Sequence, residues 1–123
     1  MRDIKFRAWD TETKEMSYDF LGKNWLKVCI ESPFVELMQY TGLKDKNGKE
    51  IYEGDITVSE HASYSILWDE NMAQFKAKIE KTDSVLTKGC SFPLWQYIEN
   101  NEKCRIEVIG NIYEHKELIK CEH

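Results

Sequence analysis

Apolar and polar residues alternate along several short stretches of the chain, and a two-residue period is typical of β-strands. At the N-terminal end, Ile4, Phe6 and Ala8 face one way, with more polar residues between them. This pattern predicts a half-buried strand. The polar run 10–15 has the composition of a turn, so residues 16–18 are expected to return antiparallel and complete a hairpin.

The most regular alternation lies between residues 73 and 79, where small or apolar residues alternate with glutamine and lysine. This predicts a strand with one face on the core and one face in water. Residues 64–68 are apolar enough for a preceding strand, and residues 69–71 are suited to the turn between them. The apolar face of the later strand consists of Ala73, Phe75, Ala77 and Ile79.

The stretch from Met38 to Ile56 connects further predicted strands through tight turns. Bulky residues before it, at 34–40, and within it, at 51–52 and 56–58, favour strands. An Asn-Gly pair tolerates positive φ and is a strong short-range turn signal. The residues that we assign to turns in this stretch are Gly42, Asn47, Gly48, Gly54 and Asp55.

The last third of the chain gives weaker signals. Residues 92–98 are expected to form a short helix that Pro93 begins. Residues 105–109 favour a strand, and Gly110 and Asn111 mark a bend or bulge within it. Residues 114–120 are expected to form one or two helical turns. Two segments have no clear period: 20–32, where a short strand is favoured over a helix, and 80–91, which has the composition of a loop.

These elements predict a mainly β protein with bent strands, organised as a single domain over residues 1–123. Charged residues reach 32% of the chain, so the apolar core is expected to be thin. The formal net charge is −5, which argues against a nucleic-acid backbone as the main partner. No apolar run has the length of a membrane helix, and the first residues lack the pattern of a signal peptide, so we expect a cytoplasmic protein and no membrane partner.

Four cysteines are widely and irregularly spaced, and no C-x-x-C pair occurs. We therefore expect free thiols rather than disulfides. Zinc sites usually contain a close pair of Cys or His ligands, so we also expect no metal. The cysteines are Cys29, Cys90, Cys104 and Cys121.

Candidate catalytic residues are few. The histidines are expected to lie at the surface, and no G-x-S-x-G nucleophile motif or phosphate-binding glycine loop is present. Asp45, Glu53 and Asp55 lie close in sequence and could bind a metal or act as acid and base. Turn carboxylates more often bind their own backbone, so we favour that structural role, with no enzyme activity and no cofactor. The histidines are His61, His115 and His123.

Lysines surround the central turn, and aromatic residues lie on strands near it in sequence. Basic side chains beside exposed aromatic rings can bind single-stranded nucleic acid. Lysines also protect strand edges from mispairing, which is the plainer explanation. The candidate binding residues are Tyr40, Lys44, Lys46, Lys49 and Tyr52; Trp9 and Trp68 are further strand aromatics, and Lys76, Lys78 and Lys81 mark a second lysine-bearing face.

Three stretches of the chain together resemble the YopX family of phage and prophage proteins. They are residues 4–10, residues 38–56, and residues 108–114 followed by Glu117-Leu118. Residues 115–116 depart from the family, which often has Asn-Pro there. The resemblance implies a mostly β fold with an SH3-like, partly open barrel, and a phage or prophage origin in a bacterial cytoplasm. It implies no established activity and no catalytic residues.

The leading hypothesis is therefore a non-enzymatic accessory protein that binds another macromolecule. We expect that partner to be a protein, and we also expect self-association into a homo-oligomer. The reason is that aromatic residues make up 12% of this small β domain, which is more aromatic surface than a thin core can cover. The second hypothesis is nucleic-acid binding through the lysine-surrounded turn. The third is an enzyme with a carboxylate site.

Overall fold

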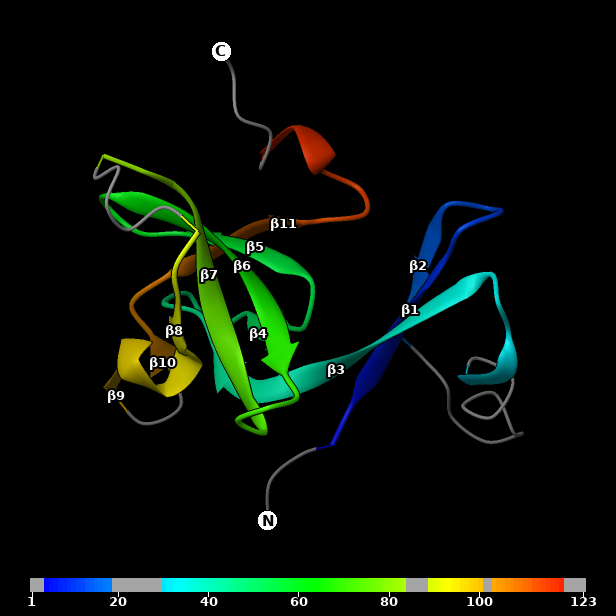
Figure 1. The fold of residues 1–123 in the computed structure, drawn as a ribbon, viewed down its shortest axis with the longest axis horizontal. Helices are drawn as coiled ribbons and strands as arrows, with labels where there is room; N and C mark the ends of the chain where they lie inside the picture. The colour runs from blue at the N-terminus through cyan, green and yellow to red at the C-terminus, as the bar shows by residue number, and fades with distance from the viewer. Residues whose placement is uncertain (1–3, 19–29, 84–88, 101–102, 119–123) are drawn as a thin grey trace.

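The computed structural model describes residues 4–18, 30–83, 89–100 and 103–118. These residues form a mainly β protein with two sheets (Figure 1). Two 3-10 turns, η1 (Leu94–Tyr97) and η2 (Lys116–Leu118), lie among the strands. The strands are β1 (Phe6–Asp10), β2 (Glu15–Ser17), β3 (Val35–Lys44), β4 (Glu50–Tyr52), β5 (Asp55–Val58), β6 (Ala62–Asp69), β7 (Gln74–Thr82), β8 (Ser91–Pro93), β9 (Ile98–Asn100), β10 (Lys103–Cys104) and β11 (Glu107–Asn111).

The first sheet has the strand order β2-β1-β3-β10-β9, and β4 also pairs with β3. The predicted N-terminal hairpin is confirmed, because β1 and β2 pair antiparallel. Strand β3 is long and bent: its first half pairs with β1, and its second half pairs with β4 and β10. Figure 1 shows it running from the β1–β2 hairpin into the body of the molecule.

The second sheet has the order β11-β5-β6-β7-β8, and neighbouring strands run antiparallel. The two strands predicted around residues 64–79 are confirmed as the long pair β6 and β7. Strand β7 begins one residue later than predicted, because Ala73 belongs to the turn and has a φ of 51°. It also extends to Thr82, so part of the predicted loop 80–91 is strand.

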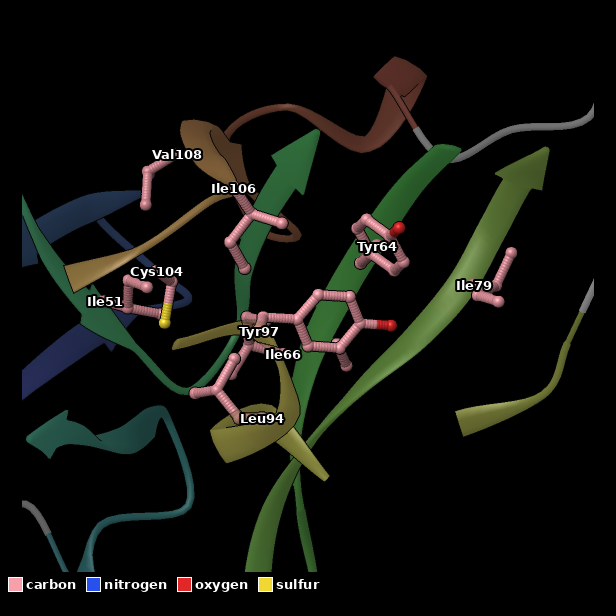
Figure 2. Close-up of a cluster of buried hydrophobic side chains, with 10 residues drawn as sticks. Ile51, Tyr64, Ile66, Ile79, Leu94, Tyr97, Cys104, Ile106 and Val108 are labelled. Atoms are coloured by element: carbon pink, nitrogen blue, oxygen red, sulfur yellow. The ribbon is translucent and has the colours of Figure 1, made fainter. Parts of the chain in front are cut away.

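An apolar cluster lies between the second sheet and the segments β4, η1 and β10 (Figure 2). Its centre is completely buried, and Ile51, Cys104 and Ile106 have no exposed surface. In Figure 2 the Tyr97 ring of η1 lies over β6, beside Tyr64 and Ile66. The members are Ile51, Tyr64, Ile66, Ala77, Ile79, Leu94, Tyr97, Cys104, Ile106 and Val108.

The predicted helix at residues 92–98 is corrected. Residues 91–93 form the edge strand β8, and only Leu94–Tyr97 form a helical turn, of the 3-10 type. A 3-10 turn brings residues three apart onto one side, so it buries Leu94 and Tyr97. At the C-terminal end the described helical turn is η2, within the predicted range 114–120. The short strand predicted within residues 20–32 lies almost wholly outside the described residues.

Strand β1 buries more than its apolar alternation predicts. Arg7 and Trp9 are buried along with Ala8, whereas Ile4 lies before the strand and is 63% exposed. Both faces of β1 therefore carry buried residues. A half-buried strand is thus wrong for its central residues, because partners distant in sequence cover Arg7 and Trp9.

The described strands pair into two open sheets and not into a closed ring. The SH3-like, partly open barrel implied by the resemblance therefore stays a prediction. Among the described residues, no helix is long and apolar enough to cross a membrane.

Candidate functional site

The Asp45 carboxylate holds the central turn together and ties it to β11. Its Oδ1 accepts hydrogen bonds from the backbone N–H groups of Asn47 at 2.9 Å and Lys49 at 2.8 Å. Its Oδ2 accepts one from Val108 N–H at 2.9 Å. The side chain is 1% exposed, so these bonds replace the water that it has lost. The structural role predicted for Asp45 is confirmed.

Asp55 forms a buried ion pair with Arg7, which joins β5 of the second sheet to β1 of the first. Arg7 Nη1 lies 2.8 Å from Asp55 Oδ1, and both side chains are 3% exposed. Asp55 Oδ2 accepts the Tyr52 N–H at 2.7 Å, and Arg7 Nη2 donates to the Glu53 carbonyl at 3.2 Å. The Arg7 guanidinium lies 4.9 Å from the centre of the Tyr52 ring, within cation–π range. We call Arg7, Tyr52, Glu53, Gly54 and Asp55 the junction.

The junction contains two of the three candidate carboxylates, and both accept hydrogen bonds from backbone N–H groups. Glu53 Oε1 accepts the Gln39 N–H at 3.2 Å. Burial raises the pKa of Glu53, and the Gln39 N–H and Arg7 oppose that rise. Burial also raises the pKa of Asp55, against the opposing effect of Arg7. Asp45 meets other partners, so the three carboxylates do not share one ligand-binding arrangement, and the described residues contain no cluster suited to a metal ion.

Gly54 lies at the centre of the junction. Its φ is +89°, and a Cβ built there would lie 2.9 Å from Met38 Sδ and 3.6 Å from Arg7 Nη2. Its N–H donates to the Ile66 carbonyl at 2.7 Å and its own carbonyl accepts the Ile112 N–H at 2.9 Å. The turn at Gly54 is confirmed, with Asp55 as the first residue of β5.

The remaining turn residues fall close to their predicted places. Asn47 and Gly48 form the central turn, where Gly48 has a φ of +87°. Gly42 is corrected: it lies within β3 at a break in the register with β4, not at the end of a strand. Gly110 lies at a bulge, as predicted. Asn111 Oδ1 accepts hydrogen bonds from the N–H groups of Tyr113 and Glu114.

The lysine-surrounded turn does not assemble with its predicted aromatic partners. Lys46 and Lys49 are exposed and Lys44 is half-buried on β3. Tyr40 and Tyr52, however, are only 4% and 5% exposed. Their rings pack against each other at a centroid distance of 5.6 Å, so they offer little surface to a stacking base. The assignment of these two tyrosines to a binding surface is therefore corrected: they belong to the interior.

Exposed aromatic side chains gather instead on one end of the second sheet. Trp68 on β6 lies opposite Phe75 on β7, and their rings meet edge to face at 4.9 Å. Phe92 on β8 lies opposite Ala77, so it is a diagonal neighbour of Phe75 on the same face. Trp95 follows on η1. Trp68, Phe92 and Trp95 are 41%, 37% and 61% exposed. We call Trp68, Phe75, Phe92 and Trp95 the aromatic surface.

Sequence reasoning identifies only Trp68 of this surface. Phe92 and Trp95 lie in the segment expected to be helical, where Pro93 gives the dominant signal. The pairing of β7 with β8 brings Phe92 beside β7, which no local pattern reveals.

The hollows in the described surface include two with contrasting linings. The larger of these two, of about 700 Å³, is lined by equal numbers of basic and acidic side chains, together with His61 and Tyr64. Lys46 is the one predicted binding residue that lines it, beside Arg105. The smaller hollow, of about 310 Å³, lies between the β1–β2 hairpin and η2.

The two described cysteines differ in exposure. Cys90 and Cys104 are free thiols, the first exposed and the second buried. Burial raises the pKa of Cys104 to about 11, so its reactive thiolate is scarce at neutral pH. Cys29 and Cys121 lie outside the described residues.

The sequence matches the family model described as "YopX protein" over residues 5–120. The chain belongs to the YopX family. Among solved structures, it is similar to protein EF1440 from Enterococcus faecalis, with a TM-score of 0.61 and 27% sequence identity. That match covers 98% of this chain and 100% of EF1440. A comparison with curated proteins gives no match.

The YopX-like stretches meet in the structure, where their side chains and backbone connect strands of the two sheets. Arg7 comes from the first stretch, and Asp45, Gly54 and Asp55 come from the second. At the point where this chain departs from the family, the His115 ring packs on Gly110: a Cβ there would lie 2.6 Å from His115 Nδ1. The same nitrogen accepts the Asn111 N–H at 3.2 Å. The YopX stretches thus account for connections between the sheets.

Proposed function

We propose that this YopX protein is a non-enzymatic accessory module, of phage or prophage origin, that binds another protein through its aromatic surface. The observation that carries this proposal is the exposure of Trp68, Phe92 and Trp95 at one end of the second sheet. Tryptophan and other aromatic residues are enriched at the energetic centres of protein interfaces. The structural duties of Asp45, Glu53 and Asp55 support the non-enzymatic role.

The test is quantitative capture from phage-producing bacterial cells with the tagged wild type and single variants. Trp95→Ser should reduce the recovered partner at least about ten-fold, the loss expected when an interface aromatic is removed. Phe92→Ser should do the same. Both side chains are partly exposed, and circular dichroism checks that each variant is folded.

Ile109→Ser is the matched control, because Ile109 is 40% exposed on β11 at the opposite edge of the same sheet. Its recovery of partner should equal that of the wild type. Equal recovery by the wild type and both aromatic variants would refute the aromatic surface as the binding site. An equal loss of recovered partner with Ile109→Ser would show that the effect is not confined to the aromatic surface. Sedimentation of the pure protein tests whether the partner is a second copy.

Nucleic-acid binding remains the rival, with Lys46 and Arg105 as the exposed cations that lie together beside one hollow. Their proximity follows from a hydrogen bond of Lys46 N–H to the Ile106 carbonyl at 3.0 Å. Titration of labelled DNA and RNA near 0.15 M salt, taken as physiological, should give little binding, because the net charge is −5. Tight binding that is lost when Lys44, Lys46 and Lys49 are replaced by glutamate would favour the rival.

A further inference from the structure

We propose that the smaller hollow binds a small, flat-ringed anion, whose phosphate or carboxylate group is held by Lys14 and Lys116. This goes beyond the proposed function, because the hollow is separate from the aromatic surface and takes a small molecule. Its lining consists of Trp9, Thr11, Lys14, Glu36, Tyr113 and Lys116.

The aromatic part of the hollow is built by two segments that are far apart in the sequence. Trp9 on β1 and Tyr113 after β11 stack with a centroid distance of 5.8 Å and an interplanar angle of 23°. Figure 1 shows the segment after β11 reaching toward the β1–β2 hairpin. Trp9 is 8% exposed and Tyr113 is half-buried, so the rings are fixed by packing but still border the hollow. Fixed aromatic rings favour a flat ligand by stacking.

The charged part favours an anion. Lys14 comes from the β1–β2 turn and Lys116 from η2, and both side chains are exposed. Neither ammonium has an ion-pair partner among the described residues. Glu36, opposite Trp9 in the register of β1 and β3, is the only carboxylate in the described lining. Two lysines therefore face one glutamate, and lysine binds phosphate or carboxylate as a point charge. Glu36 suits an N–H or O–H donor on the ligand ring.

The volume agrees with a ligand of this class. About 310 Å³ lies at the lower end of ligand pockets, which span roughly 300–1,000 Å³. Thr11 Oγ1 donates to the Phe34 carbonyl at 2.9 Å and so fixes the side of the hollow next to the turn.

The backbone of Lys14 supplies an unusually clean test. Its φ is +58°, in the left-handed region where glycine is relaxed and a residue with a Cβ is not. Lys14→Gly therefore removes the ammonium while keeping or raising the stability of the fold. A merely structural role for this residue predicts no loss of ligand.

The experiment is an NMR titration of the full chain that follows the Trp9 indole and Tyr113 signals. The probes are the four nucleoside monophosphates, 4-hydroxybenzoate, uncharged nucleosides and inorganic phosphate. At least one flat-ringed anion should shift both signals and bind at least about ten-fold more tightly than nucleoside or phosphate alone, as expected if ring and charge each contribute. Monophosphate binding and benzoate binding distinguish a phosphate-bearing from a carboxylate-bearing ligand.

Lys14→Gly and Lys116→Gln should each weaken that binding about ten-fold, the usual effect of losing one charge-assisted hydrogen bond. Lys81→Gln, which removes an exposed lysine of β7, is the matched control and should bind like the wild type. The proposal is overturned if no flat-ringed anion shifts Trp9 and Tyr113, if phosphate alone binds as tightly, or if Lys14→Gly leaves the affinity unchanged.

Discussion

The apolar cluster and the junction connect strands by opposite means. The cluster joins the second sheet to β4, η1 and β10 through apolar side chains such as Ile66 and Leu94, which are 2% and 1% exposed. The junction joins β1 to β5 through the buried pair of Arg7 and Asp55, whose polar groups also bind backbone atoms. Apolar packing is non-directional and loses stability in proportion to the area removed. A buried ion pair is directional, and the loss of one partner leaves the other charge uncompensated.

The largest effect is expected at the junction. Asp55→Ala leaves the buried Arg7 guanidinium without its carboxylate and the Tyr52 N–H without its acceptor. We expect the free energy of unfolding to fall by about 3–5 kcal/mol, as for other buried pairs that lose one member. Urea unfolding measures this change.

The control for that prediction is Glu50→Ala, which removes one member of the exposed Lys5–Glu50 pair. Surface pairs contribute under about 1 kcal/mol, so the control should lose little stability. Equal losses in the two variants would show that the junction does not depend on burial.

In the apolar cluster, the loss of stability should grow with the side-chain volume that a substitution removes. Leu94→Ala is expected to cost about 2–5 kcal/mol and Ile66→Val only about 0.5–1.5 kcal/mol, in line with the volume removed. The same urea experiment applies. A loss from Ile66→Val as large as that from Asp55→Ala would remove the distinction between the two regions.

These regions also differ in what the sequence reveals. The cluster follows in part from local patterns: the two-residue period predicts β7, the apolar composition of residues 64–68 predicts β6, and the Asn47-Gly48 pair predicts the central turn. The junction does not, because Arg7 sits in an alternating stretch where an arginine ordinarily faces water. Its burial depends on Asp55, which is distant in sequence, and no periodicity encodes that pairing.

The candidate sites show the same division. The structural roles of Asp45, Gly48 and Gly54 follow from residue type alone, because turn chemistry is local. The burial of Tyr40 and Tyr52 is not predictable in this way, since their rings meet only once β3 pairs with β4, and Arg7 of β1 then lies over the Tyr52 ring. The aromatic surface likewise exists only once β8 pairs with β7.

Glycine substitutions separate backbone geometry from packing. Gly48 and Gly54 have nearly equal φ values of +87° and +89°, but an added Cβ meets nothing within 4 Å at Gly48 and lies 2.9 Å from Met38 Sδ at Gly54. Gly48→Ala should cost about 1–2 kcal/mol from the backbone alone. Gly54→Ala should cost about 2–4 kcal/mol, because overpacking is added. Equal changes in melting temperature would mean that Met38 moves aside without cost.

The smallest effect concerns Glu53 at the junction and appears as a dependence on pH. Burial raises the pKa of Glu53 in the folded protein above its unfolded value of about 4.3. The folded state therefore holds this proton more tightly, so the contribution of Glu53 to stability is full below that unfolded pKa and is lost as the pH rises through the folded pKa. Glu53→Gln removes this loss and keeps an oxygen that can accept the Gln39 N–H. Relative to the wild type, the variant should gain stability as the pH rises from about 4 toward 7, the range over which such a carboxyl ionises. Urea unfolding at several pH values gives the difference directly, and a difference that stays constant across this range would contradict the prediction.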